Sequence, residues 1–213
     1  MKLIDKIDWK LKHVIGDLYR RKINIKLQNK LTNPDFSIIS SNCIGGILSH
    51  DLNLRFNSPT INVFFLAEDF VKFCEDLPGY LNSELTYKKQ NDGIDGPYPV
   101  CSLKDIDIYF AHYKDFDECL LKWEERKKRV NYKNLFIIWT DRNNCTDELV
   151  ERFSKIQYRK IMFSHKPMPK YDFVVHVPGF EDKQQVPMLN EYCDYRGTRY
   201  YEKYFDFVDW LNK

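Results

Sequence analysis

Cys43 is the residue in this chain with the most obvious capacity for chemistry. It lies between Asn42 and the pair Gly45-Gly46, directly after an apolar run at residues 36–40. A thiol at the start of a helix feels the positive end of the helix dipole, which favours the thiolate. Free amides at Gly45 and Gly46 could hold an oxyanion or a phosphate. Two interpretations stay open: a reactive thiol, and a buried cysteine beside a Gly-Gly turn.

Polar side chains also follow three other apolar runs. They are His112, Asp141, Asn144 and His165. The carboxyl ends of parallel strands meet at one edge of a sheet, so we expect these side chains to face Cys43. A histidine beside Cys43 would give the thiolate–imidazolium pair that nucleophilic thiols need. The alternative is an edge whose histidine and amide groups only hydrogen-bond to a ligand.

Asp141 has two interpretations of its own. With Asn143 and Asn144 it could bind a metal ion or a sugar hydroxyl. Asp and Asn at this place also cap the helix that follows, which is their commoner role. The sequence contains no GxGxxG, P-loop or HExxH motif, so it assigns no cofactor and no metal.

A third group of candidates lies in the charged segment 116–129. Trp123, Arg126 and Arg129 are three residues apart and share one edge of a predicted helix. An indole beside two guanidinium groups could hold an anionic sugar or a phosphate. The alternative is a solvated helix face with Trp123 in the core.

Alternating strands and helices must position these residues. Strands are predicted at residues 36–40, 61–66, 84–88, 106–110, 135–139, 159–163 and 173–177. Helices are predicted at 44–52, 68–80, 116–129, 146–156 and 202–211, and a loop at 90–99. Strands separated by such helices favour parallel pairing. We expect one α/β domain over residues 31–213, a three-layer sandwich with a mostly parallel sheet and helices on both faces.

Residues 1–30 are predicted to form a basic amphipathic helix, with Gly16 as a weak point. They carry nine Lys and Arg against three acids, a net charge of +6 in a chain of net charge +2. The basic face would suit peripheral contact with an anionic membrane. The alternative, which the pattern favours, is a helix packed on the domain with its lysines in solvent.

Composition excludes some classes of protein. The small net charge argues against a nucleic-acid partner. The six cysteines show no CxxC pair, which indicates free thiols in a reducing compartment. No apolar run approaches the length of a membrane span. We therefore expect a cytoplasmic protein, with or without association with a membrane surface.

Two stretches resemble the DUF1919 family, bacterial proteins of unknown function that are often described as exopolysaccharide or capsule biosynthesis proteins. Residues 36–46, followed by Asn57-Ser58-Pro59-Thr60, are similar to the family's strand, Ser-Asn-Asn-Cys-Trp-Gly-Gly motif and Ser/Thr-Pro turn. Ser41 replaces the first asparagine of that motif, and Ile44 replaces its tryptophan. His112-Tyr113, Trp123, Arg126 and Arg129 resemble the family's His-Tyr and Trp-x-x-Arg-x-x-Arg segment.

The resemblance implies a role in polysaccharide assembly. We expect a transferase acting on a sugar nucleotide, an acyl donor or a lipid-linked sugar, or else a non-catalytic sugar- or nucleotide-binding module. The expected catalytic residues are Cys43, as nucleophile or pocket wall, and His112, as general base. The expected substrate-binding residues are Asn42, Gly45, Gly46, Ser58, Trp123, Arg126, Arg129, Asp141, Asn144 and His165.

Overall fold

The computed structural model describes residues 3–93 and 96–213. Residues 1–2 of the predicted N-terminal helix and 94–95 of the predicted loop lie outside the described residues. The chain divides into two compact units. The sheet unit consists of Asp35–Gly46 and Phe56–Val186, and the terminal unit of Met1–Pro34, Ile47–Arg55 and Pro187–Lys213. Each is described by itself.

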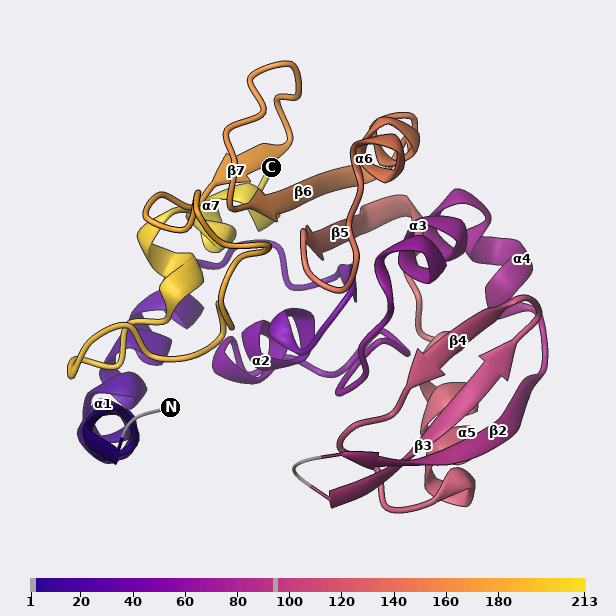
Figure 1. Ribbon diagram of the computed structural model, residues 1–213, viewed down its shortest axis with the longest axis horizontal. Coiled ribbons are helices and arrows are strands. Elements are labelled where there is room, and N and C mark those ends of the chain that lie inside the picture. The colour runs from indigo at the N-terminus through magenta and orange to yellow at the C-terminus, as the bar shows by residue number, and fades with distance from the viewer. Residues whose placement is uncertain (1–2, 94–95) are drawn as a thin grey trace. The chain divides into compact units, whose positions relative to one another are not determined.

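A parallel sheet forms the centre of the sheet unit. Its strands are β1 (Ser37–Ser40), β5 (Leu135–Thr140), β6 (Arg159–Ser164) and β7 (Val174–His176), side by side in that order. Figure 1 labels β5, β6 and β7 of this sheet. Every residue of β5 is buried. A continuous apolar run of this kind is typical of a central parallel strand. The four predicted strands that form this sheet are confirmed.

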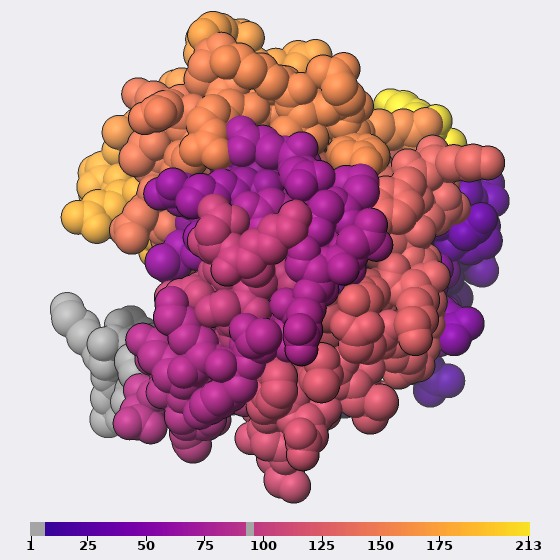
Figure 2. All heavy atoms as spheres, turned by 90° about the vertical axis from the view of Figure 1, so that its right-hand side faces the viewer, coloured from indigo at the N-terminus to yellow at the C-terminus, as the bar shows by residue number. Residues whose placement is uncertain are grey.

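A second, antiparallel sheet contains β2 (Leu85–Gly93), β3 (Gly96–Leu103) and β4 (Ile106–Tyr109). The predicted strand at 106–110 therefore exists but does not belong to the parallel sheet. Figure 2 shows the surface on this side of the sheet unit, with residues near 85–105 in magenta to pink.

The predicted loop at 90–99 is wrong for its described residues, because residues 90–93 belong to β2 and residues 96–99 to β3. Asn, Asp, Gly and Pro usually interrupt strands, and they prompted the loop prediction. Here Pro97 and Pro99 lie in the part of β3 that pairs only with β2, since β4 pairs from Val100 onward. Proline is tolerated where one side of a strand is free, because its missing N–H is not needed there.

The described helices of the sheet unit cover both sheets around one core. They are the start of α2 (Ile44–Asp51), α3 (Ala67–Glu75), α4 (Leu77–Leu81), α5 (Phe116–Lys127), the 3-10 helix η1 (Tyr132–Asn134) and α6 (Asp147–Ser154). α3 packs on α6, and α5 packs on β2 and β3. Buried side chains of both sheets, such as Leu103 and Ile137, belong to the same apolar cluster.

Two predicted elements of the sheet unit differ from those in the structure. The helix predicted at 68–80 is divided at Asp76, whose side chain accepts a hydrogen bond from the Gly79 amide and caps α4. Residues 61–66 form no strand. Asn62 has a φ of 60°, and Phe64 makes only an isolated bridge to Tyr109. A left-handed residue inside such a short run prevents a continuous ladder of hydrogen bonds.

The terminal unit is built on α1 (Leu3–Lys30), so the predicted N-terminal helix is confirmed. The helix predicted at 202–211 is instead the 3-10 helix η2 (Tyr200–Lys203) and the short α7 (Phe207–Leu211). Gly16 does not break α1. A Cβ there would lie 2.8 Å from Tyr192 Cδ2 and 3.1 Å from Gly197 Cα, so glycine permits this close approach. The chain is therefore a mixed α/β protein with an N-terminal helix.

Candidate functional site

The carboxyl ends of β1, β5 and β6 meet at one edge of the parallel sheet. Asn42 joins two of these ends, because its Nδ2 donates to Thr140 Oγ1 at 3.1 Å. Its Oδ1 accepts from the Ile44 amide at 3.1 Å, which caps the start of α2. Asn42 is therefore fixed at the expected edge, and its amide group is already used to hold the edge together.

A buried Asp141–His165 pair lies at the same edge. Asp141 Oδ2 is 2.5 Å from His165 Nδ1 and accepts from the His165 amide at 2.6 Å. Asp141 Oδ1 accepts from the Val186 amide at 2.8 Å. An ionised carboxylate only accepts hydrogen bonds, so it fixes Nδ1 as the protonated nitrogen when the imidazole is neutral. His165 Nε2 is then the nitrogen that can take up a proton.

Asp141 can adopt this role because β5 and β6 are neighbours in parallel register. Its amide donates to the Phe163 carbonyl at 3.0 Å, which continues the ladder past the end of β5. The side chain is thereby directed to the first residue after β6, which is His165. Sequence reasoning named both residues but did not pair them. The signal was present, because both follow adjacent buried strands.

Cys43 lies beside this edge but is half-buried. Burial raises the pKa of its thiol to about 11. At neutral pH the group is therefore a thiol. Of the two interpretations that the sequence left open for Cys43, this favours the buried cysteine, because desolvation disfavours the charged form.

The glycine pair after Cys43 serves close packing. A Cβ on Gly45 would lie 2.9 Å from Ser40 Cβ and 3.0 Å from Ile38 Cγ2, both on β1. A Cβ on Gly46 would lie 3.3 Å from Ile61 Cγ2. These contacts let the first turn of α2 approach β1 more closely than a larger residue would allow.

Ser58 belongs to a small buried network behind β1. Its Oγ lies 3.0 Å from Thr60 Oγ1 and accepts from the Thr60 amide at 3.2 Å. Thr60 Oγ1 in turn accepts from the Ser40 amide at 3.0 Å. Ser58 therefore supports the end of β1, and no contact of its side chain points to a ligand.

Trp123, Arg126 and Arg129 are engaged in internal contacts of the sheet unit. Trp123 is buried between the rings of Phe73 and Phe110. This matches the alternative in which it belongs to the core.

Arg126 and Arg129 both stabilise the segment of residues 56–61. Arg129 Nη1 donates to the Phe56 carbonyl at 3.2 Å, and the Arg126 guanidinium lies over the Phe56 ring at 5.3 Å. Arg126 also donates to Tyr113 Oη at 2.6 Å, and that hydroxyl donates to the Ile61 carbonyl at 2.7 Å. This part of the family motif therefore stabilises a loop.

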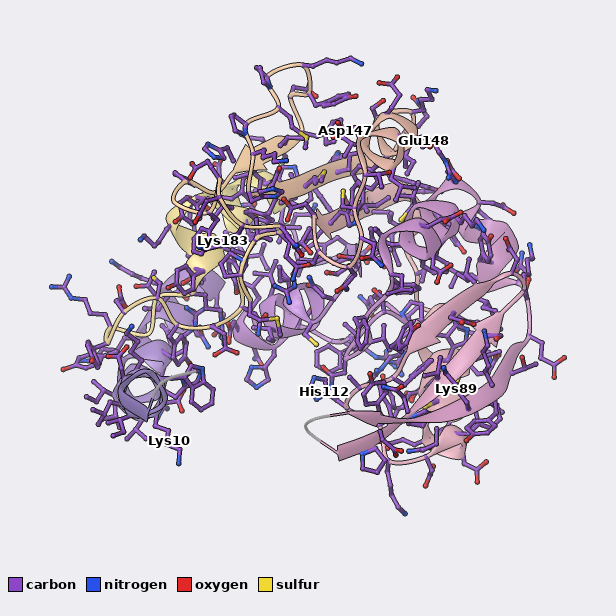
Figure 3. The ribbon with its side chains drawn as sticks, in the orientation of Figure 1. Lys10, Lys89, His112, Asp147, Glu148 and Lys183 are labelled. Atoms are coloured by element: carbon purple, nitrogen blue, oxygen red, sulfur yellow. The ribbon has the colours of Figure 1, made fainter. Side chains whose placement is uncertain are left out.

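His112 and Asn144 are exposed. His112 follows β4, so it belongs to the antiparallel sheet and not to the carboxyl edge of the parallel sheet (Figure 3). The expectation that all four strand ends share one edge is wrong for this strand. Asn144 has a φ of 69° and lines a surface hollow with Asn143, Glu68 and Glu148.

The terminal unit contains a charged network that sequence reasoning missed. Asp51 accepts from Arg20 Nη2 at 2.7 Å and from Arg199 Nε at 2.7 Å. Arg20 also donates to both carboxylate oxygens of Glu202, each at 2.8 Å. No spacing in the sequence could reveal it, because the partners come from three distant segments.

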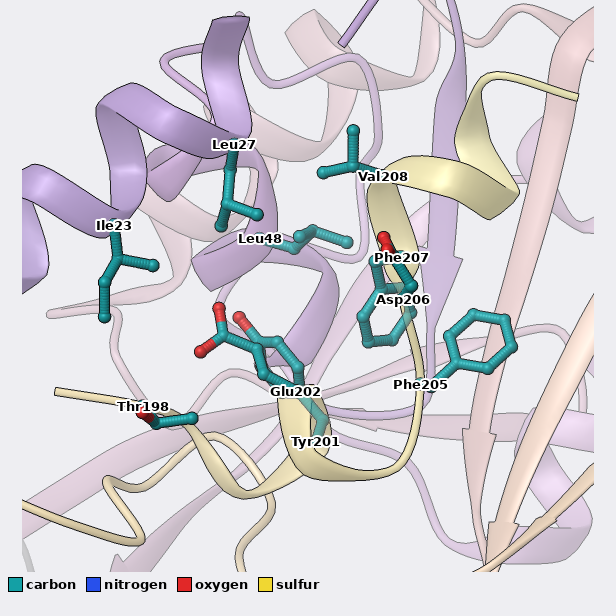
Figure 4. Close-up of a pocket in the computed structure, with 10 residues that line it drawn as sticks. All are labelled: Ile23, Leu27, Leu48, Thr198, Tyr201, Glu202, Phe205, Asp206, Phe207 and Val208. Atoms are coloured by element: carbon teal, nitrogen blue, oxygen red, sulfur yellow. The ribbon is translucent and has the colours of Figure 1, made fainter. Parts of the chain in front are cut away.

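Beside this network lies a cavity of about 290 Å³, shown in Figure 4. Its walls are largely apolar, with Leu27, Leu48 and Phe207 among the lining side chains. Tyr201 also lines it, and its buried hydroxyl has no hydrogen-bond partner among the described residues. Burial keeps the pKa of Tyr201 above its usual range, so the hydroxyl stays protonated.

Two further kinds of site are absent from the described residues. No helix within residues 3–93 and 96–213 is long and apolar enough to cross a membrane. In the same part of the chain, no group of three or more His, Cys, Asp or Glu side chains could hold a metal ion.

The fold and the carboxyl edge of its parallel sheet define the class: an α/β protein in which Asn42, Asp141 and His165 lie where parallel strands end. The model of the domain of unknown function DUF1919 matches residues 14–212, so the chain belongs to that family. An uncharacterized protein of Haemophilus influenzae is 36% identical over 204 residues, which cover 95% of this chain and 97% of that protein. The family resemblance found in the sequence is thus confirmed.

Proposed function

We propose that this protein is a transferase of cell-surface polysaccharide assembly, with His165 as its general base and general acid. The observation that carries the proposal is the 2.5 Å contact between Asp141 Oδ2 and His165 Nδ1 at the carboxyl edge of the parallel sheet. In open α/β folds this edge is the usual ligand site. The role in polysaccharide assembly rests on the description often given to the DUF1919 family.

The pair suits transfer of a glycosyl or acyl group to a hydroxyl. Asp141 orients the imidazole and holds it in the tautomer with the proton on Nδ1. His165 Nε2 takes the proton from the acceptor hydroxyl as the oxygen attacks the donor carbon. The bond from that carbon to the leaving group breaks, and the imidazolium can return its proton to the leaving group. The donor is a sugar nucleotide, an acyl thioester or a lipid-linked sugar.

The location and layering of the protein are also inferred. All six cysteines are free, which suits the reducing environment of the cytoplasm. We infer helices on both faces of the parallel sheet, since a parallel sheet is normally covered on both sides. The buried pattern of β5 supports such a three-layer arrangement.

One observation favours a second candidate, a binding module for a sugar or nucleotide that performs no reaction. Cys43 has a pKa of about 11, so the most nucleophilic atom near the edge is protonated at neutral pH. In that case Asp141 and His165 would orient a ligand by hydrogen bonds alone. The two candidates differ in whether loss of the imidazole abolishes turnover or only weakens binding.

The test is turnover with a panel of sugar nucleotides and acyl thioesters, measured for the wild type and for His165→Gln. Glutamine keeps a hydrogen-bonding group of similar size but cannot accept and return a proton. We expect a loss of about 100-fold or more in kcat with little change in KM. His50→Gln, at an exposed histidine of the terminal unit, is the matched control.

Full activity of His165→Gln would exclude His165 as the general base. A separate variant, His112→Gln, tests the histidine that the sequence predicted as the general base. Donor binding without turnover by the wild type would select the binding module. Melting temperatures of all variants show whether a loss reflects unfolding.

A further inference from the structure

One stripe of α1 is apolar and exposed to solvent. It consists of Ile7, Leu11, Val14, Leu18 and Ile25. On an ideal helix these five positions fall within about 60° of arc. Val14 is 67% exposed and Leu18 is 74% exposed. Contiguous exposed apolar surface of this kind marks a site of interaction.

The helix is held in the terminal unit by a different face. His13 Nε2 lies 2.8 Å from Glu191 Oε2, and Gly16 lies against Tyr192. One turn further on, Arg20 enters the buried network with Asp51. The stripe is therefore not needed to anchor α1, and it remains available for another surface.

Positive charge borders the stripe on both sides. Lys10 and Arg21 lie along one border, and Lys22 and Lys26 along the other. All four side chains are exposed and form no ion pair with any residue that the structure describes. Figure 3 shows Lys10 extending away from the ribbon.

The acids that lie nearest are already engaged. Asp8 pairs with Lys12 and hydrogen-bonds to Tyr195, and Asp17 accepts from Tyr192 Oη at 2.8 Å. The exposed face of α1 thus combines apolar side chains with uncompensated cations.

We propose that α1 lies in the plane of an anionic lipid bilayer, with the stripe at the boundary between headgroups and acyl chains. Such a surface offers apolar contact for Val14 and Leu18 and negative charge for the four flanking cations. A second copy of the chain is a poorer occupant, because it would bring the same cations close together without neutralising them. The inference does not rest on the proposed transferase activity.

The experiment is co-sedimentation of the full chain with phosphatidylglycerol–phosphatidylcholine vesicles and with pure phosphatidylcholine vesicles. We expect binding to the anionic vesicles at least tenfold tighter than to the neutral ones. The double variant Val14→Ser with Leu18→Ser should bind at least tenfold more weakly. Each of Lys10→Gln, Arg21→Gln, Lys22→Gln and Lys26→Gln should weaken binding about fivefold.

Leu121→Ser is the matched control, because Leu121 is 63% exposed on α5 in the sheet unit. It should bind vesicles like the wild type. No binding to anionic vesicles, or equal binding by the stripe variant, would overturn the proposal. So would a lipid-free dimer in sedimentation velocity that the stripe variant dissociates, since the stripe would then belong to a second copy.

Discussion

A charged partner separates the group at the sheet edge that can react from the one that cannot. Cys43 and His165 both follow strands and both looked reactive in the sequence. The structure gives His165 a carboxylate partner, and it gives Cys43 a desolvated thiol with a pKa of about 11. Sequence reasoning could place both near one edge, but it could not show that Asp141 pairs with His165 and that the Cys43 thiol is desolvated.

The thiol can be tested by its reaction with iodoacetamide, followed at Cys43 by peptide mass spectrometry. Only the thiolate reacts, so the rate should rise about tenfold per pH unit from pH 7 to pH 10 without a plateau. In urea the same peptide should reach half its maximal rate at about pH 8.5. A plateau in the folded protein below pH 8.5 would show an activated thiol and contradict this description.

Gly45 was expected to leave its amide free for a ligand, and the structure gives the residue a packing role. Gly45→Ala should lower the free energy of unfolding by about 1–3 kcal/mol, because the new Cβ would overlap Ser40 and Ile38. Gly46→Ala, whose nearest contact is 3.3 Å, should cost less. Urea unfolding of both variants gives the comparison. A neutral or stabilising Gly45→Ala would show that β1 and α2 have room between them.

At the scale of elements, periodicity found α1 but gave no indication of which face is buried. The apolar positions Ile7, Leu11, Val14 and Leu18 predicted the helix, yet their side chains are exposed. The face that packs contains Gly16 and Arg20. A hydrophobic pattern cannot predict this, because the buried charge of Arg20 is compensated by Asp51 and Glu202 from distant parts of the chain.

The network around Asp51 ties α1 to α2 and to the segment before η2. Burial by itself would raise the pKa of Asp51, but the hydrogen bond from Arg199 and the charges of Arg199 and Arg20 lower it below its usual value. The ionised form is therefore favoured by folding. Its contribution to stability is complete above about pH 4, the pKa of an unfolded aspartate, and is lost as the pH falls through the lower folded value.

Asp51→Asn should lower the free energy of unfolding by about 3–5 kcal/mol at pH 7, because Arg20 and Arg199 lose a buried counter-ion. The deficit relative to the wild type should shrink as the pH falls below 4. Urea unfolding at several pH values measures both effects. Asp209→Asn removes an exposed pair with Lys213 in the same unit and should change stability by less than about 1 kcal/mol. Equal effects of the two variants would contradict the role of the network.

At the scale of the whole molecule, the sequence predicts the parallel sheet well and the antiparallel sheet poorly. β1, β5 and β6 are short apolar runs. Strands that are buried on both faces have such continuous apolar sequences, so they can be recognised from the sequence. β2 and β3 contain Asn, Asp, Gly and Pro, which predict a loop when the pairing partner is unknown. The misplaced His112 follows from the same cause, since the direction of β4 depends on that pairing.

The chain contains only five histidines, so the NMR signal of each imidazole can be followed separately. The His165 signal then reports on the carboxyl edge of the parallel sheet. The measurement is the NMR spectrum of the ring nitrogens during titration with sugar nucleotides and acyl thioesters, with His165→Gln assigning the signal of interest. We predict that a donor which binds shifts the His165 signal and leaves the signals of His13 and His50 in place. A bound donor that shifts His112 and leaves His165 unmoved would contradict the assignment of the site to the carboxyl edge of the parallel sheet.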